Sequence, residues 1–117
     1  MTQPQQLPSD DAQRIPVNFT AEELQFIQES WKLTDRQTEM LTHLFAWKIP
    51  KQIAPMMGIE TKSVYRLIDE ARLRAGLCDG ADGMKEAAAK WIARKRVDPT
   101  LPAYIWRFEH ERPGESA

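Results

Sequence analysis

The sequence predicts an all-α protein: a four- to five-helix bundle that contains a helix-turn-helix, with flexible tails at both ends. Two capping boxes, Thr20 to Glu23 and Thr34 to Gln37, indicate helix N-termini. Apolar residues then recur three or four positions apart, the spacing of a helix that packs on a core. Gly58 separates two short segments of this kind, and a tight turn between packed helices favours glycine.

The chain of 117 residues has room for one small domain. Residues 1–18 combine three prolines with Gln, Ser and Asp and have few apolar residues, so we expect a disordered arm there. The helical domain is expected over residues 19–97. An extended aromatic tail is expected over residues 98–117.

Several classes of protein are disfavoured by composition. No apolar run approaches the roughly 20 residues that cross a bilayer, and the first residues are too polar for a signal peptide, so we expect a cytoplasmic protein without membrane contact. The single cysteine, Cys78, excludes an intrachain disulfide and a cysteine-rich zinc site. His43 and His110 have no companions that indicate a metal site. With no catalytic motif either, we expect no metal, no cofactor and no enzymatic activity.

The first two helices are predicted from their caps. Phe19 and Leu24 have the spacing of a hydrophobic staple around the first capping box, and a helix over about 21–31 should follow. The second capping box begins a helix that should end near 47–48, because the Pro50 ring disfavours the α conformation at the residue before it.

The next two helices flank Gly58, with one over about 50–57 and the other over 61–75. Stepping by about 100° per residue gives the longer helix one apolar seam. The seam consists of Val64, Ile68, Ala71 and Ala75. The opposite, mixed-charge side carries Lys62, Tyr65, Arg66, Asp69, Glu70 and Leu73.

A last helix is predicted over about 84–97 from its alanine-rich sequence and from the cations at its C-terminal end. The residues expected to share one face of it are Ala88, Trp91, Ile92 and Lys95. Beyond it, Tyr104, Trp106 and Phe108 alternate with other residues, which is a strand period without an evident partner strand. We expect this tail to be extended, either folded back onto the helices or docked on another chain.

Charge is distributed unevenly along the chain. Residues 1–32 have two Lys or Arg and five Asp or Glu, a net charge of −3. Residues 33–97 have 12 and eight, a net charge of +4, and residues 98–117 have two and four, a net charge of −2. A basic middle between acidic ends is compatible with a modest phosphate-binding surface.

The basic stretch resembles the LuxR/GerE-type helix-turn-helix DNA-binding domain. The likeness lies in the order and spacing of short elements: Leu-Thr, a Glu within the next helix, Lys-x-Ile-Ala, Gly-Ile at the turn, and Lys-Ser-Val after it. The matching residues are Leu33, Thr34, Arg36, Glu39, Leu41, Lys51, Ile53, Ala54, Gly58, Ile59, Lys62, Ser63, Val64 and Gly76. The resemblance covers roughly residues 33–92. No receiver or autoinducer domain precedes it, so regulation by those routes is not expected.

The resemblance implies a bacterial or phage regulator of transcription that binds inverted-repeat double-stranded DNA as a homodimer. Lys51, Lys62 and Ser63 would contact phosphates, and Tyr65, Arg66 and Asp69 would face the bases. The dimer contact would use Ala88, Trp91, Ile92 and Lys95. Arginine can bind guanine bidentately, which suits the predicted position of Arg66.

Other interpretations stay open. The Lys62 and Arg66 pair could be an ordinary solvated helix face. The chain could also be a protein-binding adaptor or anti-activator that uses a helix-turn-helix scaffold on a transcription factor or RNA polymerase. In that case Tyr104, Trp106 and Phe108 would supply the protein contact, with Trp106 as its anchor.

Overall fold

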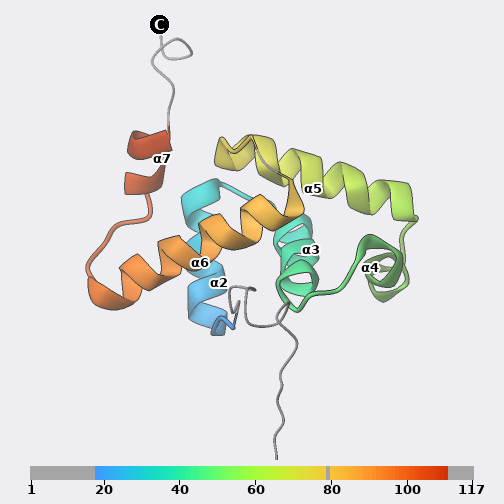
Figure 1. Ribbon diagram of the computed structural model, residues 1–117, viewed down its shortest axis with the longest axis horizontal. Coiled ribbons are helices and arrows are strands. Elements are labelled where there is room, and N and C mark those ends of the chain that lie inside the picture. Colours follow the sequence, from blue (N-terminus) through green and yellow to red (C-terminus); the bar gives the residue numbers. More distant parts are fainter. Residues whose placement is uncertain (1–17, 79, 111–117) are drawn as a thin grey trace, which may run out of the picture.

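The computed structural model describes residues 18–78 and 80–110, and every regular element in these ranges is a helix. Figure 1 shows how the helices are arranged, and their buried side chains form one hydrophobic core. They are α2 (Ala21–Trp31), α3 (Asp35–Phe45), α4 (Pro50–Met57), α5 (Thr61–Ala75), α6 (Ala81–Val97) and α7 (Ile105–His110). The all-α fold class is therefore confirmed. The predicted arm lies outside the described residues, apart from Asn18.

Both predicted capping boxes are formed. The Thr20 hydroxyl accepts from the Glu23 amide at 3.1 Å, while the Glu23 carboxylate accepts from the Thr20 amide at 3.0 Å. Thr34 and Gln37 make the same reciprocal pair at the start of α3. Both boxes satisfy amide groups that have no partner inside the helix, which explains why α2 and α3 begin where the sequence predicts.

Two predicted boundaries were wrong by a few residues. The helix α3 ends at Phe45, because Trp47 takes a left-handed backbone conformation with φ of 65°. The helix α6 begins at Ala81 rather than near Met84, so part of the loop predicted from its glycines is helical. Asp82 in the first turn of α6 is favoured there by the helix dipole, which helps the early start.

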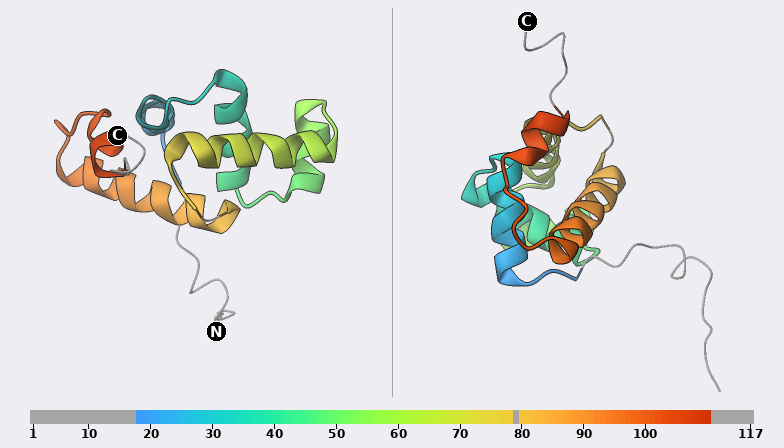
Figure 2. Two further views of the ribbon diagram at one scale, coloured as in Figure 1. Left: turned by 90° about the horizontal axis from the view of Figure 1, so that it is seen from above. Right: turned by 90° about the vertical axis from the view of Figure 1, so that its left-hand side faces the viewer.

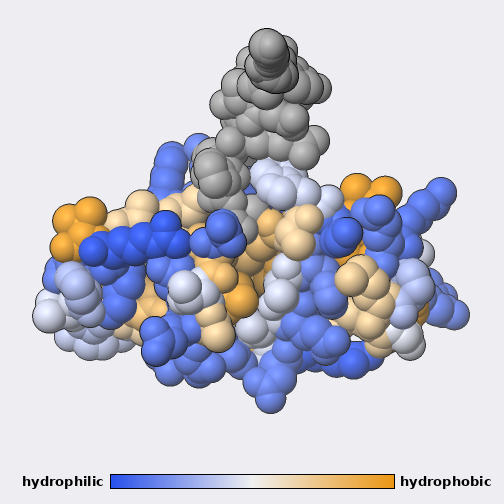
Figure 3. Space-filling view, turned by 90° about the horizontal axis from the view of Figure 1, so that it is seen from below, coloured by the Kyte–Doolittle hydropathy of each residue, from blue (hydrophilic) through white to orange (hydrophobic). Residues whose placement is uncertain are grey.

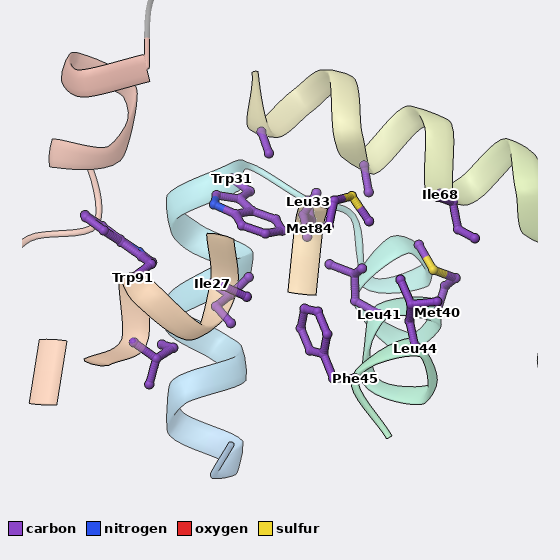
Figure 4. Close-up of a cluster of buried hydrophobic side chains, with 14 of the residues drawn as sticks. Ile27, Trp31, Leu33, Met40, Leu41, Leu44, Phe45, Ile68, Met84 and Trp91 are labelled. Atoms are coloured by element: carbon purple, nitrogen blue, oxygen red, sulfur yellow. The ribbon is translucent and has the colours of Figure 1, made fainter. Parts of the chain in front are cut away.

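The core gathers large side chains from all the long helices (Figure 4). Trp31 from α2, Met40 from α3 and Ile92 from α6 have no exposed surface at all. Each helix turns one stripe inward, and the seam predicted for α5 is buried along its whole length. This packing fixes the rotation of α5 about its axis, and hence which of its side chains reach solvent.

The extended aromatic tail was a wrong prediction, because residues 105–110 form the helix α7, which folds back onto α2 (Figure 2). The Trp106 indole is buried and its Nε1–H donates to the Ala75 carbonyl at 2.8 Å. Aromatic residues at every second position fit a strand, in which all three would share one face. They also fit one helical turn, in which Tyr104 and Phe108, four residues apart, lie on one side and Trp106 lies on the other. Trp106 is thus a core residue and cannot anchor a partner.

Candidate nucleic-acid interface

The helices α4 and α5 are joined by a sharp turn at Gly58. Gly58 has φ of 69°, a left-handed conformation that glycine adopts without steric cost. The amide of Ile59 donates to the Ala54 carbonyl at 2.9 Å and closes the end of α4. The Ile59 side chain packs against the core beside the turn. The turn and the core together hold α5 at a fixed angle to α4.

The outer face of α5 carries the side chains predicted to face the bases. Tyr65, Arg66 and Asp69 are all exposed, and Tyr65 presents 59% of its surface to solvent. Lys62 is also exposed, whereas Ser63 is half-buried at the start of the helix. The structure therefore brings Lys62, Tyr65, Arg66 and Asp69 together along one side of α5, whereas Ser63 points away from Tyr65.

The acidic residues on α5 are engaged within the protein. The Asp69 carboxylate accepts from the Arg72 guanidinium at 2.6 Å and 3.2 Å. The Glu70 carboxylate accepts from the Gln37 side chain at 3.3 Å. Arg72 occupies Oδ1 of Asp69, while the Asp69 side chain stays 60% exposed, so a base would share this carboxylate with Arg72. Arg66 makes no ion pair within the described ranges, so its guanidinium is available to a ligand.

The first turns of α4 and α5 each carry an exposed lysine, Lys51 and Lys62. Lys51 is exposed in the first turn of α4, and no acidic residue accompanies it there. At α5 the N-cap residue is Glu60, whose side chain does not cap the helix and instead lies 3.6 Å from Lys62 Nζ. Uncapped helix N-termini attract phosphate through their free amide groups. The sequence reasoning overlooked Glu60, although an acidic residue just before a predicted helix was a visible signal.

Two basic residues of α6, Arg94 and Arg96, are neutralised by carboxylates from the acidic ends of the chain. Arg96 binds the Glu23 carboxylate at 2.7 Å and 2.8 Å, and this pair holds the pKa of Glu23 below its usual value. Arg94 binds both carboxylate oxygens of Glu109 at 2.7 Å and 2.8 Å, which lowers the pKa of Glu109. The excess positive charge of the middle segment is thus not spread evenly. The unpaired part of it includes Lys51 and Arg66.

The predicted dimer face is used inside the chain. Ala88, Trp91 and Ile92 are buried, and the Trp91 Nε1–H donates to the Ser30 hydroxyl at 2.8 Å. Lys95 is half-buried, with its ammonium group bound to the Pro99 and Leu101 carbonyls at 2.7 Å and 2.8 Å. Ala88, Trp91 and Ile92 have almost no surface left for a second copy, and the Lys95 ammonium group is already bound to the two carbonyls. Their assignment to a dimer contact was wrong.

Comparisons with protein-family models, with curated proteins and with solved structures gave no match to this chain. Within the described ranges, no group of three His, Cys, Asp or Glu side chains could hold a metal ion. None of the described helices is both long enough and apolar enough to span a membrane. A binding role of the α4–α5 surface is therefore supported by its geometry and charge.

Proposed function

We propose that the chain is a sequence-specific DNA-binding regulator of transcription, in which α5 enters the major groove of a duplex. The observation that supports it best is the exposed side of α5, where Lys62, Tyr65 and Arg66 project from a helix whose other side is locked into the core. A ligand that meets this side meets a rigid row of side chains, and preorganised contacts favour specificity.

The dimensions suit this role. An α-helix with its side chains is about 10–12 Å wide, and the major groove is about 12 Å wide. In this pose Arg66 would donate two hydrogen bonds to a guanine, and the Tyr65 ring would contact base edges or a thymine methyl group. Lys62, Ser63 and Lys51 would contact phosphates on either side, helped by the free amide groups at the helix starts.

Inverted-repeat recognition would require a homodimer, and its contact must lie outside the buried face of α6. Candidates are the exposed apolar side chains at the end of α6 and around α7: Val97, Tyr104 and Phe108. On the face away from α5, hydrophobic residues show as separate areas among hydrophilic ones (Figure 3). The second candidate function, a protein-binding adaptor, is favoured by the same exposed Tyr104 and Phe108 rings, which contact each other with centroids 6.1 Å apart.

Selection of binding sites from random duplex DNA with the purified chain tests the proposal directly. We expect enrichment of a defined sequence, and an affinity that falls steeply as salt is raised. Arg66→Ala should cost about 1–3 kcal/mol of binding free energy and relax specificity at one base pair. Lys62→Ala should weaken binding to all sequences alike and reduce the salt slope by about one.

Arg107→Ala is the matched control, because Arg107 is an exposed arginine on α7, at the opposite end of the molecule from α4 (Figure 1). It should leave both the affinity and the selected sequence unchanged. Weak, sequence-independent binding that Arg66→Ala and Lys62→Ala leave unaltered would refute the regulator. Capture of a transcription factor or RNA polymerase that is lost in Phe108→Ala would then favour the adaptor.

A further inference from the structure

Two carboxylates lie about one helical turn beyond Arg66 on α5. Asp69 is three residues and Glu70 four residues further along the helix, the two spacings at which side chains of one helix meet. All three side chains are exposed. In an isolated helix Arg66 would pair with one of these carboxylates. In the folded chain Arg66 forms no ion pair within the described ranges, and each carboxylate is bound to another side chain.

The partner of Glu70 is Gln37, a side chain of α3 that makes two hydrogen bonds. Its Oε1 accepts from the Thr34 amide at 3.0 Å in the capping box, and its Nε2–H donates to Glu70 Oε1 at 3.3 Å. Only 4% of Gln37 is exposed, so its amide group has little access to water. This bond therefore joins the start of α3 to the exposed side of α5.

Two interactions compete for the Glu70 carboxylate. An exposed ion pair within one helix shifts an equilibrium by about twofold, and by less where the cation precedes the anion, as Arg66 precedes Glu70. Leaving a buried hydrogen-bond donor without a partner shifts an equilibrium by about fivefold or more. Glu70 should therefore stay with Gln37, and Asp69 is bound by Arg72 at 2.6 Å. The Arg66 guanidinium then remains without a competing carboxylate.

We propose that Gln37 is a positioning residue of the DNA interface, which holds Glu70 away from Arg66 and so keeps the guanidinium available to a guanine. This inference rests on the proposed DNA-binding function. Because Gln37 is buried, it would act only through Glu70. A released Glu70 would occupy the same pair of guanidinium donors that a guanine needs.

The substitution Gln37→Glu tests the proposal, because it keeps the acceptor of the capping box and replaces the donor to Glu70 with a carboxylate oxygen. Repulsion should then release Glu70 toward Arg66. In the free protein the NMR signal of Arg66 Nε–H should shift. In binding assays the preference for guanine at the base pair read by Arg66 should weaken by about twofold. Combining Gln37→Glu with Glu70→Gln exchanges donor and acceptor at unchanged net charge, and should restore both the signal and the preference.

Gln52→Glu is the matched control for the added charge. Gln52 is exposed at the corresponding capping position of α4, where its Oε1 accepts from the Ile49 amide at 3.0 Å. A glutamate there keeps this bond and adds a negative charge close to the proposed phosphate contacts. It should weaken binding to all sequences alike, and it should leave both the base preference and the Arg66 signal unchanged.

Three results would overturn the role of Gln37. They are an Arg66 signal that does not move in Gln37→Glu, a base preference that Gln52→Glu weakens equally, and an Arg66 signal that moves in Glu70→Gln alone. The last variant changes an exposed side chain, and a shift in it would mean that Arg66 already pairs with Glu70. Preserved dispersion of the indole N–H signals shows that each variant is folded. The Arg66 signal is measured without DNA, so it decides the role of Gln37 even for a chain that binds no duplex, a result that would refute the proposed function.

Discussion

Arginine side chains form different ion pairs in two regions of the molecule. At the end formed by α6 and α7, Arg94 and Arg96 each bind a carboxylate from another helix, and both bonds are short. Along α5, Arg72 binds Asp69 within the helix, while Arg66 projects into solvent. Arginines thus tie helices together in one region, whereas in the other Arg66 stays exposed and makes no ion pair within the described ranges.

This difference shows why charge counted along the sequence is an incomplete guide to a nucleic-acid surface. The segment 33–97 carries a net +4, but part of that charge is cancelled by Glu23 and Glu109, which lie outside the segment. Exposed cations without an ion pair in the described ranges include Lys51 on α4 and Arg66 on α5, but also Arg36 on α3 and Arg74 at the end of α5. Neither the net charge nor the unpaired cations alone therefore locate the candidate interface, which also depends on the exposed side of α5.

The largest expected effect tests whether the α6–α7 end is core or contact surface. Trp106→Ala should lower the free energy of unfolding by about 3–5 kcal/mol, because it removes a buried ring and its bond to the Ala75 carbonyl. Phe108→Ala should change it by no more than about 0.5 kcal/mol, since 71% of that side chain is exposed. Urea denaturation measures both. Similar losses for the two variants would contradict the burial of Trp106.

Much of the fold could be predicted from local signals. The capping boxes, Pro50 and Gly58 place the starts of α2, α3 and α4 and the turn before α5 from interactions within a few residues. The apolar seam then gives the exposed side of α5, and with it the positions of Lys62 and Arg66. These predictions succeed because each depends on neighbours in the sequence.

The rest depended on contacts between distant segments. Trp106 alternates with two other aromatic residues, and only its contact with the end of α5 reveals it as core. Trp47 has a left-handed backbone, which is rare for a bulky residue, and the Lys85 ammonium lies 4.0 Å above its ring. The burial of the predicted dimer face likewise required knowing that α2 and the tail cover it. No pattern within a single helix contains this information.

A smaller effect separates two buried tryptophans that look equivalent in the sequence. Trp91 Nε1–H donates to Ser30, whereas Trp31 Nε1–H has no partner among the described residues. Trp91→Phe should therefore cost about 1–2 kcal/mol more than Trp31→Phe, since both lose the same ring volume but only one loses a hydrogen bond. Thermal or urea unfolding compares them. The reverse order would show that Trp31 has a partner after all.

Substitutions of Glu60, the N-cap residue of α5, should change the free energy of unfolding by about 1 kcal/mol. Glu60→Ser should provide a side-chain cap, and Glu60→Gln should not, so the serine variant should be the more stable by roughly that amount. Both variants remove a carboxylate from the proposed phosphate site, and both should bind DNA more tightly. Stability and DNA affinity are measured on the same pair. Weaker DNA binding by Glu60→Gln would indicate that this helix end does not meet phosphate.

The smallest effect concerns pH at the opposite end of the molecule. The Arg96 guanidinium, which donates to Glu23, holds the pKa of this carboxyl below its ordinary value of 4.5. A carboxyl whose pKa is lower in the folded state than in the unfolded state stabilises the fold at pH values above its unfolded-state pKa. That stabilisation is lost as pH falls below about 4.5 and through the folded-state value. Glu23→Gln should therefore destabilise the protein at neutral pH and flatten its loss of stability on acidification.

Part of that loss should persist in Glu23→Gln, because the pKa of Glu109 is lowered by Arg94 and the pKa of Asp98 by the Thr100 hydroxyl. Glu22→Gln is the matched control, since Glu22 is exposed on the same helix and forms no ion pair within the described ranges. Urea unfolding between neutral pH and pH of about 3 measures the slopes. Equal slopes for Glu23→Gln and Glu22→Gln would mean that the bond between Glu23 and Arg96 does not hold α2 to α6 in solution. The contrast between paired arginines on α6 and Arg66 on α5 would then lose its main support.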